Sequence, residues 1–311
     1  MNWDHGHKAP MMGRAAIASM VVAFTLIVVK AVAWFMSGSV ALLGSLVDSV
    51  LDLAASVINF LAVRTSLEPP DEEHRFGHGK AEAIAGLFQA SIIIGSAAFL
   101  MLESLGRLWS PEQVTAGNLG IYVSVFAIFL TLGLVLYQRH VVKQTGSVAI
   151  EADSLHYKGD LLLNAAVIAA LWLSTSGGIT WADGAFGVAI ALYIAWAASE
   201  IFRTSVDMLM DKEFEPSERE EIFNLVMGNP DVKGMHDLKT RRSGLSSFIQ
   251  LHIEVDPEMS VYDAHGVGDE VEATVGEVFP HADILIHVDP LGLEGHMPGH
   301  QEIPIKPEGV L

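Results

Sequence analysis

Residues 44–60 read GSLVDSVLDLAASVINF, an apolar stretch that carries two aspartates, Asp48 and Asp52, four positions apart. Residues 151–166 read EADSLHYKGDLLLNAA and carry His156 and Asp160 at the same spacing. On a helix, this spacing places both side chains of a pair on one face. Ionisable side chains inside membrane-spanning helices are costly and by default mark functional sites. The two pairs are therefore candidates for a shared site, provided that the surrounding sequence spans a membrane.

The rest of the chain has the composition of a membrane protein. Its 311 residues are 51% hydrophobic and 18% charged, whereas soluble domains carry about 25% charged residues, and the mean hydropathy is +0.39. A helix needs about 20 apolar residues to cross the hydrocarbon layer. Six stretches meet this length, at residues 14–36, 39–63, 82–107, 118–139, 147–173 and 179–203. We therefore predict a polytopic α-helical membrane protein with six transmembrane helices between residues 14 and 210.

Charge divides the chain into two regions. Residues 1–210 hold 16 acidic and 11 basic side chains, whereas residues 211–311 hold 21 acidic and 7 basic ones. This balance suits cations and argues against nucleic acid as a partner, because phosphate binding needs clustered Lys and Arg. The absence of cysteine excludes disulfides and thiolate metal sites. Any metal ligands must therefore come from carboxylates and the 13 histidines.

Basic residues near the ends of the spans predict the orientation. One side of the membrane would carry the N-terminus, the loops at residues 64–80 and 139–146, and the C-terminal region. It holds nine basic residues near the spans: Lys8, Arg14, Arg64, Arg75, Lys80, Arg139, Lys143, Arg203 and Lys212. The other side has only Arg107 beside its loops. Because basic residues gather on the cytoplasmic side of the lipid bilayer, we expect both termini to be cytoplasmic.

Packed side by side, the second and fifth spans would bring three carboxylates and one imidazole to one point. That ligand set suits tetrahedral Zn²⁺ and can also hold Fe²⁺, Mn²⁺ or Cd²⁺. The alternative, an aspartate that caps a helix or faces a water-filled crevice, accounts for a single aspartate more readily than for two pairs. Lys30 and Lys158 also lie within spans. Lys158 is turned to another face, where snorkelling or pairing with a carboxylate would accommodate it.

The loop after the second span offers a second set of ligands. Residues 68–83 read EPPDEEHRFGHGKAEA, in which Asp71, His74 and His78 have compact metal-ligand spacing. Gly77 and Gly79 allow a tight turn between and after the histidines. Exposed histidines in a loop are often without function, so the spacing by itself indicates a candidate site only.

The acidic C-terminal region has the pattern of a small α+β domain at residues 211–290. Helical periodicity at 215–227 and 260–279 and strand patterns at 235–242, 248–256 and 283–289 predict the order α-β-β-α-β, a metallochaperone-like arrangement. Any one histidine here is more often structural, but together they favour metal binding, with the candidate ligands His236, His252, His265, His287 and Asp289. We expect residues 291–311 to be a disordered tail and residues 1–13 to be a short cytoplasmic segment.

Six spans, DxxxD in the second, HxxxD in the fifth and the α-β-β-α-β region together resemble the cation diffusion facilitator family over residues 12–290. The likeness is to its bacterial zinc and ferrous-iron efflux members. It implies a homodimer in the bacterial inner membrane whose C-terminal domains meet at a V-shaped interface. It also implies a transporter, not an enzyme, that exchanges cytoplasmic divalent metal for protons. Zinc leads among the candidate metals, followed by Cd²⁺, Fe²⁺ and Mn²⁺.

The same resemblance implies roles for individual residues. The transport site is matched by Asp48, Asp52, His156 and Asp160, and the loop site by Asp71, His74 and His78. A binuclear site, with Asp289 as the bridging ligand, is matched by His236, His252, His265, His287 and Asp289. A charge pair that interlocks the membrane and tail regions is matched by Lys80 and Asp211. Val288 stands where close relatives can carry a polar residue beside the bridging carboxylate, which bears on the coordination of the second metal.

These ligands suggest a mechanism. Metal binding needs deprotonated ligands and therefore expels protons, and crowded carboxylates raise one another's affinity for protons and that of the imidazole. A site that faces the two sides of the membrane in turn would exchange metal for protons. In the dimer, the two acidic C-terminal domains would repel each other until cations neutralise part of their charge. Metals bound to these domains, which we call tail metals, would therefore regulate the dimer. The alternative there is a permanently metallated structural site.

Two other classes of protein remain as alternatives. A membrane metalloenzyme, such as an intramembrane protease, would need an open metal position and a general base, and the sequence lacks the HExxH pattern. A metal sensor that signals through its tail would have no need of two pairs of intramembrane ligands. The sequence therefore favours transport over both.

Overall fold

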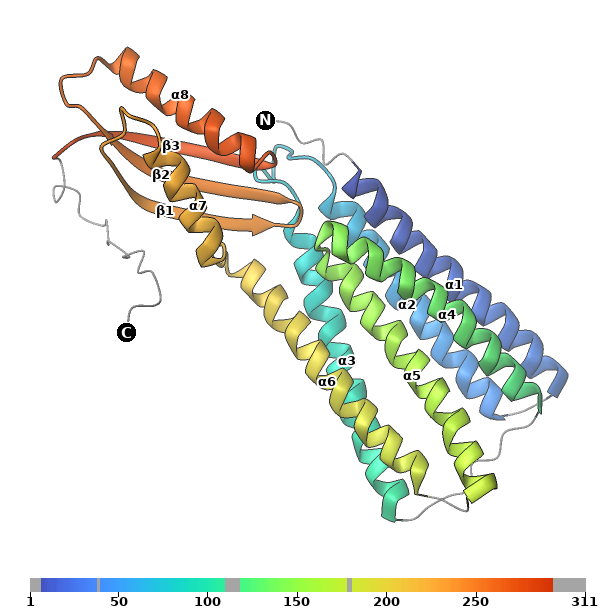
Figure 1. The fold of residues 1–311 in the computed structure, drawn as a ribbon. Coiled ribbons are helices and arrows are strands. Elements are labelled where there is room, and N and C mark those ends of the chain that lie inside the picture. The colour runs from blue at the N-terminus through green and yellow to red at the C-terminus, as the bar shows by residue number, and fades with distance from the viewer. Residues whose placement is uncertain (1–6, 38–39, 110–117, 178–180, 293–311) are drawn as a thin grey trace. The chain divides into compact units, whose positions relative to one another are not determined.

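The computed structural model describes residues 7–37, 40–109, 118–177 and 181–292, drawn as coloured ribbon in Figure 1. These residues form two compact units, one covering Gly6–Val206 and the other formed mainly by Asp207–Leu311. Most of the expected disordered tail, residues 293–311, and residues 1–6 of the expected N-terminal segment lie outside the described residues.

The first unit contains six long helices, one for each predicted span. They are α1 Lys8–Ser37, α2 Val40–Ser66, α3 Lys80–Trp109, α4 Asn118–Thr145, α5 Val148–Gly177 and α6 Ala182–Leu209. Most of them extend beyond the predicted apolar stretches. Residues 8–13, expected to precede the first span, are part of α1, and Pro10 lies in its first turn, where a proline needs no hydrogen-bond partner. The predicted fold class is confirmed.

Five of these helices are long and apolar enough to cross a membrane. They are α1, α3 and the segments Leu42–Ser66, Ile121–Thr145 and Gly184–Leu209 of α2, α4 and α6. Helix α5 has 30 residues as well, but its first half carries Glu151, Asp153, Lys158 and Asp160. Because α5 packs against α2, α3 and α4, these polar groups have protein neighbours, as ionisable groups in a membrane require.

Buried hydrogen bonds hold α5 among the neighbouring helices. The carboxylate of Asp153 is fully buried and accepts bonds from Ser19 Oγ of α1 at 2.5 Å and from Gln138 Nε2 of α4 at 2.7 Å. One turn later, the hydroxyl of Tyr157 lies 2.9 Å from Ser56 Oγ of α2. Hydrogen-bonded polar groups of this kind help to join membrane helices. They fix the position of the helix that carries His156 and Asp160.

Helices α3 and α6 approach each other closely at two glycines. Gly184 and Gly187 of α6 face Ser104 of α3, and a Cβ atom added at Gly184 would lie 2.9 Å from the backbone oxygen of Ser104. Small residues at such positions let the backbones of membrane helices come together. Glycine at position 184 is therefore a packing requirement.

The second unit is the predicted α-β-β-α-β domain. Its elements are α7 Pro216–Met227, β1 Gly234–Ser243, β2 Ser246–Val255, α8 Val261–Val278 and β3 Ala282–Pro290. The strand order is β1-β2-β3, with β1 and β2 antiparallel and β2 and β3 parallel. Helix α8 makes the crossover that a parallel pair requires.

Side chains alternate between two faces along β2. Alternate residues pack with both helices in one hydrophobic core, which includes Ile249, Leu251, Ile253, Ile222 and Val271. Because successive side chains of a strand point to opposite faces, His252 and Glu254 lie on the other face of the sheet. The hydrophobic core therefore decides which face presents the polar residues.

We expect Gly184→Ala to destabilise the first unit, which we call the membrane unit. Its methyl group would meet the backbone of Ser104 at 2.9 Å, and overpacking of this kind costs about 1–3 kcal/mol. The matched control is Gly95→Ala in α3, where no atom lies within 4 Å of the added Cβ. Thermal unfolding in detergent, followed by size-exclusion chromatography, should show a lower midpoint for Gly184→Ala only. Equal midpoints would contradict the close approach of α3 and α6.

Candidate functional site

Helices α2 and α5 bring three of the predicted transport ligands together. The Nε2 atom of His156 lies 2.9 Å from Oδ1 of Asp52 and 3.8 Å from Oδ2 of Asp160. One ligand atom from each residue lies within 4.8 Å of the other two, so small side-chain movements would place all three around one metal ion. Asp48 lies one turn before Asp52 on α2 with its side chain exposed, and it is not among the three residues that meet. Its place in the site stays a prediction.

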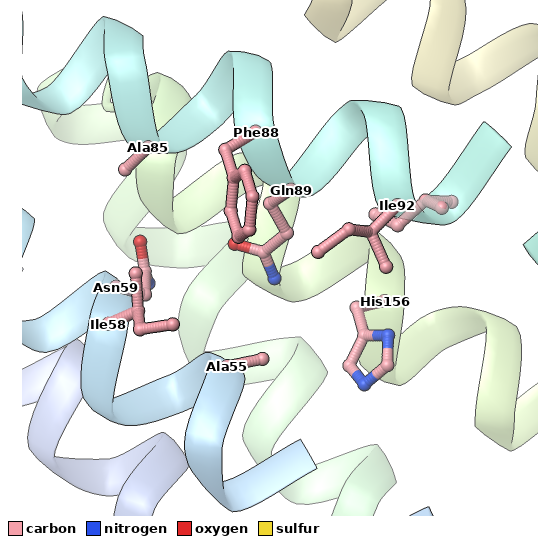
Figure 2. A pocket seen from close by; sticks show the side chains of 9 residues that line it. Ala55, Ile58, Asn59, Ala85, Phe88, Gln89, Ile92 and His156 are labelled. Atoms are coloured by element: carbon pink, nitrogen blue, oxygen red, sulfur yellow. The ribbon is translucent and has the colours of Figure 1, made fainter. Parts of the chain in front are cut away.

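A small pocket adjoins this group between α2, α3 and α5 (Figure 2). It has a volume of about 40 Å³, and its lining is apolar except for His156, Asn59 and Gln89, which Figure 2 labels. The amide of Asn59 is buried, and neither its nitrogen nor its oxygen has a hydrogen-bond partner among the described residues. A pocket of this size has room for about one water molecule beside the imidazole.

The loop between α2 and α3 brings the second predicted group together. His78 Nε2 lies 3.2 Å from His74 Nδ1 and 3.3 Å from Asp71 Oδ2, and His74 Nδ1 lies 3.4 Å from Asp71 Oδ1. Gly77 has a φ of 77°, a left-handed conformation that glycine adopts readily, and it turns the chain between the two histidines. The three residues are therefore arranged as the spacing predicts.

Backbone hydrogen bonds keep Asp71 in its anionic form. The N–H of His74 donates to Asp71 Oδ1 at 2.6 Å, and the N–H of Glu73 donates to the same oxygen at 2.9 Å. These bonds, above all the one from His74, lower the pKa of Asp71 below its usual value. The loop thus offers one charged carboxylate and two imidazoles as ligands.

In the second unit, strand register aligns three of the predicted tail ligands. His236 of β1 pairs with His252 of β2, which in turn pairs with His287 of β3. The ring centroids of neighbouring histidines lie 5.0 Å and 4.6 Å apart. Asp289 follows His287 by two positions and therefore lies on the same face of β3.

The carboxylate of Asp289 contacts all three imidazoles. Its Oδ2 lies 2.9 Å from Nδ1 of His252 and 3.5 Å from Nε2 of His236, and its Oδ1 lies 3.2 Å from Nε2 of His287. One oxygen faces two histidines and the other oxygen faces the third. This arrangement suits a carboxylate that binds two metal ions, one through each oxygen.

Glu254 is a further acidic residue at this group, and it was absent from the predicted ligands. It is buried, pairs with Asp289 in the sheet register, and its Oε1 lies 4.0 Å from Nε2 of His236. The alternation of FIQLHIEVD places it two positions after His252 on the same face. The alternation in the sequence could therefore have identified Glu254 as a further candidate ligand.

Two further residues singled out in the C-terminal domain, His265 and Val288, lie apart from this group. His265 is exposed on α8, with its Nε2 3.7 Å from Oδ2 of Asp269, and it is not brought to the row of histidines within this chain. The reason is that α8 buries a different face, through Val271 and its neighbours. Val288 packs against the hydrophobic core, so it lies on the other face of β3 from Asp289. A role for His265 as a ligand stays a prediction.

The predicted charge pair divides between the two units. Lys80 is the first residue of α3, whereas Asp211 follows α6 in the second unit. The Oδ1 of Asp211 lies 3.3 Å from Nη1 of Arg241, within the second unit. The proposed interlock between Lys80 and Asp211 stays a prediction.

Comparison with known proteins covers both units. Residues 16–210 match the family model of the cation efflux transmembrane domain, and residues 214–291 match that of the cation efflux protein, cytoplasmic domain. The cation-efflux pump FieF of Serratia proteamaculans is 46% identical over 282 residues, which are 91% of this chain and 94% of that protein. FieF of Yersinia enterocolitica is 47% identical, again over 91% of this chain and 94% of the relative. The solved metal-bound C-terminal domain of the CzcD transporter from Thermotoga maritima is 34% identical, with a TM-score of 0.24, and the match covers 25% of this chain and 96% of that domain.

The similarity is thus spread along the whole of both units, and it includes the helices that carry the paired intramembrane ligands. The alignments with the two FieF relatives extend over nearly the full length of each relative. The chain therefore belongs to the cation diffusion facilitator family and is a cation efflux transporter.

Proposed function

We propose that the chain is a homodimeric antiporter that exports divalent metal, chiefly Zn²⁺, in exchange for protons. Cd²⁺, Fe²⁺ and Mn²⁺ are further substrates, and the protein lies in a bacterial inner membrane with both termini in the cytoplasm. The observation that carries this proposal is the 2.9 Å contact between His156 Nε2 and Asp52 Oδ1, with Asp160 beside it. One nitrogen and carboxylate oxygens form a ligand set that takes zinc and also tolerates the other three metals.

Proton exchange follows from the same contact. A hydrogen bond between an imidazole nitrogen and a carboxylate oxygen needs a proton between them. Both groups bind a metal ion only when that proton has left. An arriving divalent ion must therefore displace the proton shared by His156 and Asp52, and a returning proton competes with the ion for the same atoms.

We expect zinc flux into proteoliposomes to depend on an imposed pH gradient and to fall at least about tenfold in Asp52→Asn, which removes one ligand. The matched control is Glu103→Gln in α3, which also removes a membrane-domain carboxylate but one that pairs with Arg107 at 2.6 Å. That control should keep the wild-type flux. If the flux of Asp52→Asn equals that of the wild type, the pathway lies elsewhere. If the flux is the same with and without the pH gradient, proton coupling is refuted.

We also propose that metals bound at the row of tail histidines draw the two C-terminal domains of the dimer together. Residues 211–311 hold 21 acidic side chains against 7 basic ones, so two copies repel each other until cations neutralise part of that charge. Asp289 supports this role because it contacts three imidazoles at once.

A distance measurement tests the role of the tail. The chain has no cysteine, so Glu272→Cys on the exposed side of α8 gives one labelling position per protomer. Zinc should shorten the distance between two spin labels in this background, and it should leave the distance unchanged once Asp289→Asn is added. Adding Glu277→Gln instead, an exposed change on the same helix, should keep the response. A distance that is already short and insensitive to zinc would identify a structural site.

The loop site makes a prediction about pH. Because the pKa of Asp71 is lowered, its carboxylate carries its charge throughout the neutral range and loses it only below its usual titration range, about pH 3.9. Asp71→Asn should therefore weaken loop binding by the same factor at about pH 6 and at about pH 8. Zinc titration of a chain that also carries Asp52→Asn and Asp289→Asn measures this factor. A factor that vanishes toward pH 6 would show that Asp71 is already protonated there.

A further inference from the structure

Two lysines, Lys30 and Lys158, lie within the predicted spans of the membrane unit, and they have different partners. Lys158 of α5 donates to the hydroxyl of Tyr193 on α6 and lies 4.7 Å from the centroid of its ring. The partner of Lys158 is thus a tyrosine, whereas the sequence predicts either snorkelling or pairing with a carboxylate. Lys30 of α1 reaches to α2 instead, where its Nζ donates to the backbone oxygen of Ser45 at 3.1 Å and to Ser49 Oγ at 2.6 Å.

The Lys30 side chain could have extended toward the membrane interface, so the position that it takes instead is informative. Lys30 lies seven residues before Ser37, the end of α1, which is about 10 Å along the helix. A lysine at that depth can extend its side chain toward the interface. Lys30 instead crosses to the buried hydroxyl of Ser49, which neighbours Asp48 in sequence. Its ammonium therefore stays at the level of the transport ligands.

The two partners of this ammonium on α2, Ser45 and Ser49, stand on either side of Asp48 in the sequence. Asp52 follows Asp48 by one turn of the same helix. Together with Asp160, these aspartates are the three carboxylates predicted for the transport site, and their charge is opposite to that of the ammonium.

Once a metal ion has displaced the proton of His156, three carboxylates and one lysine leave two negative charges, which one divalent cation cancels. A monovalent cation would leave one negative charge and a trivalent cation would leave one positive charge. The loaded site is therefore neutral only with a divalent ion. This matters because uncompensated charge is costly inside a membrane.

We propose that Lys30 is the fixed counter-charge of the transport site, which makes the site neutral when it holds one divalent cation and weakens that binding enough for release. The proposal rests on the transport site described under the proposed function. Transport needs binding that is strong enough to capture an ion and weak enough to let it leave. Lys30 acts through its charge and is a positioning residue, not a ligand.

Zinc flux in proteoliposomes containing full-length Lys30→Met tests this role. Removing a positive charge near a divalent ion should lower KM by about tenfold. It should also lower kcat, because a more tightly held ion leaves more slowly. A lysine that only joined α1 to α2 would give the opposite result, a loosened site with a raised KM. Lys30→Gln is the second variant, and it answers the same question if Lys30→Met does not fold.

A control variant tests whether the charge is what matters. Lys30→Arg keeps the charge and should keep KM within about twofold of wild type. Asp52→Asn is measured in parallel. If its flux is lost but KM in Lys30→Met or Lys30→Gln is unchanged or raised, the role of Lys30 is overturned on its own. If Asp52→Asn keeps its flux, the proposed transport site fails and the role of Lys30 fails with it.

Discussion

An ionisable side chain inside a bilayer needs a partner, and the arrangement of the membrane unit depends on this constraint. Helix α5 carries several such groups, and three of them have partners on three different helices. Asp153 accepts a bond from Ser19 of α1, Lys158 donates to Tyr193 of α6, and His156 contacts Asp52 of α2. Because its partners surround it, α5 is held in position by its polar side chains as well as by packing.

The proposed transport ligands on α5 differ from the other polar groups of that helix in one respect. Asp153 is satisfied by neutral donors, which need no ion to complete them. Among the described residues, the polar partners of the His156 ring are the carboxylates of Asp52 and Asp160, and such a group keeps an excess of negative charge. Protons or a metal ion can remove that excess. The proposed transport site therefore lies where the protein by itself leaves negative charge uncompensated.

Periodicity in the sequence predicts the parts of the structure that depend on one element at a time. The spacing of His156 and Asp160 placed both on one face of α5, and the alternation around His252 placed it opposite the core. Contacts between elements were less predictable. The row formed with His236 and His287 depends on register across three strands, and a slip of one residue would turn a histidine into the core. His265 was grouped with this row by type and not by position.

The candidate metal sites of the membrane helices and of the sheet differ in what holds their residues together. In the tail, His236, His252 and His287 are kept in register by the hydrogen bonds of a sheet, so separating them means breaking backbone pairing. In the membrane, Asp52 and His156 belong to two helices that are joined by side-chain contacts. Helices packed in this way can shift by small translations without losing backbone hydrogen bonds. The sheet therefore fixes the spacing of its candidate ligands, whereas the helix pair allows the spacing of its own candidate ligands to change.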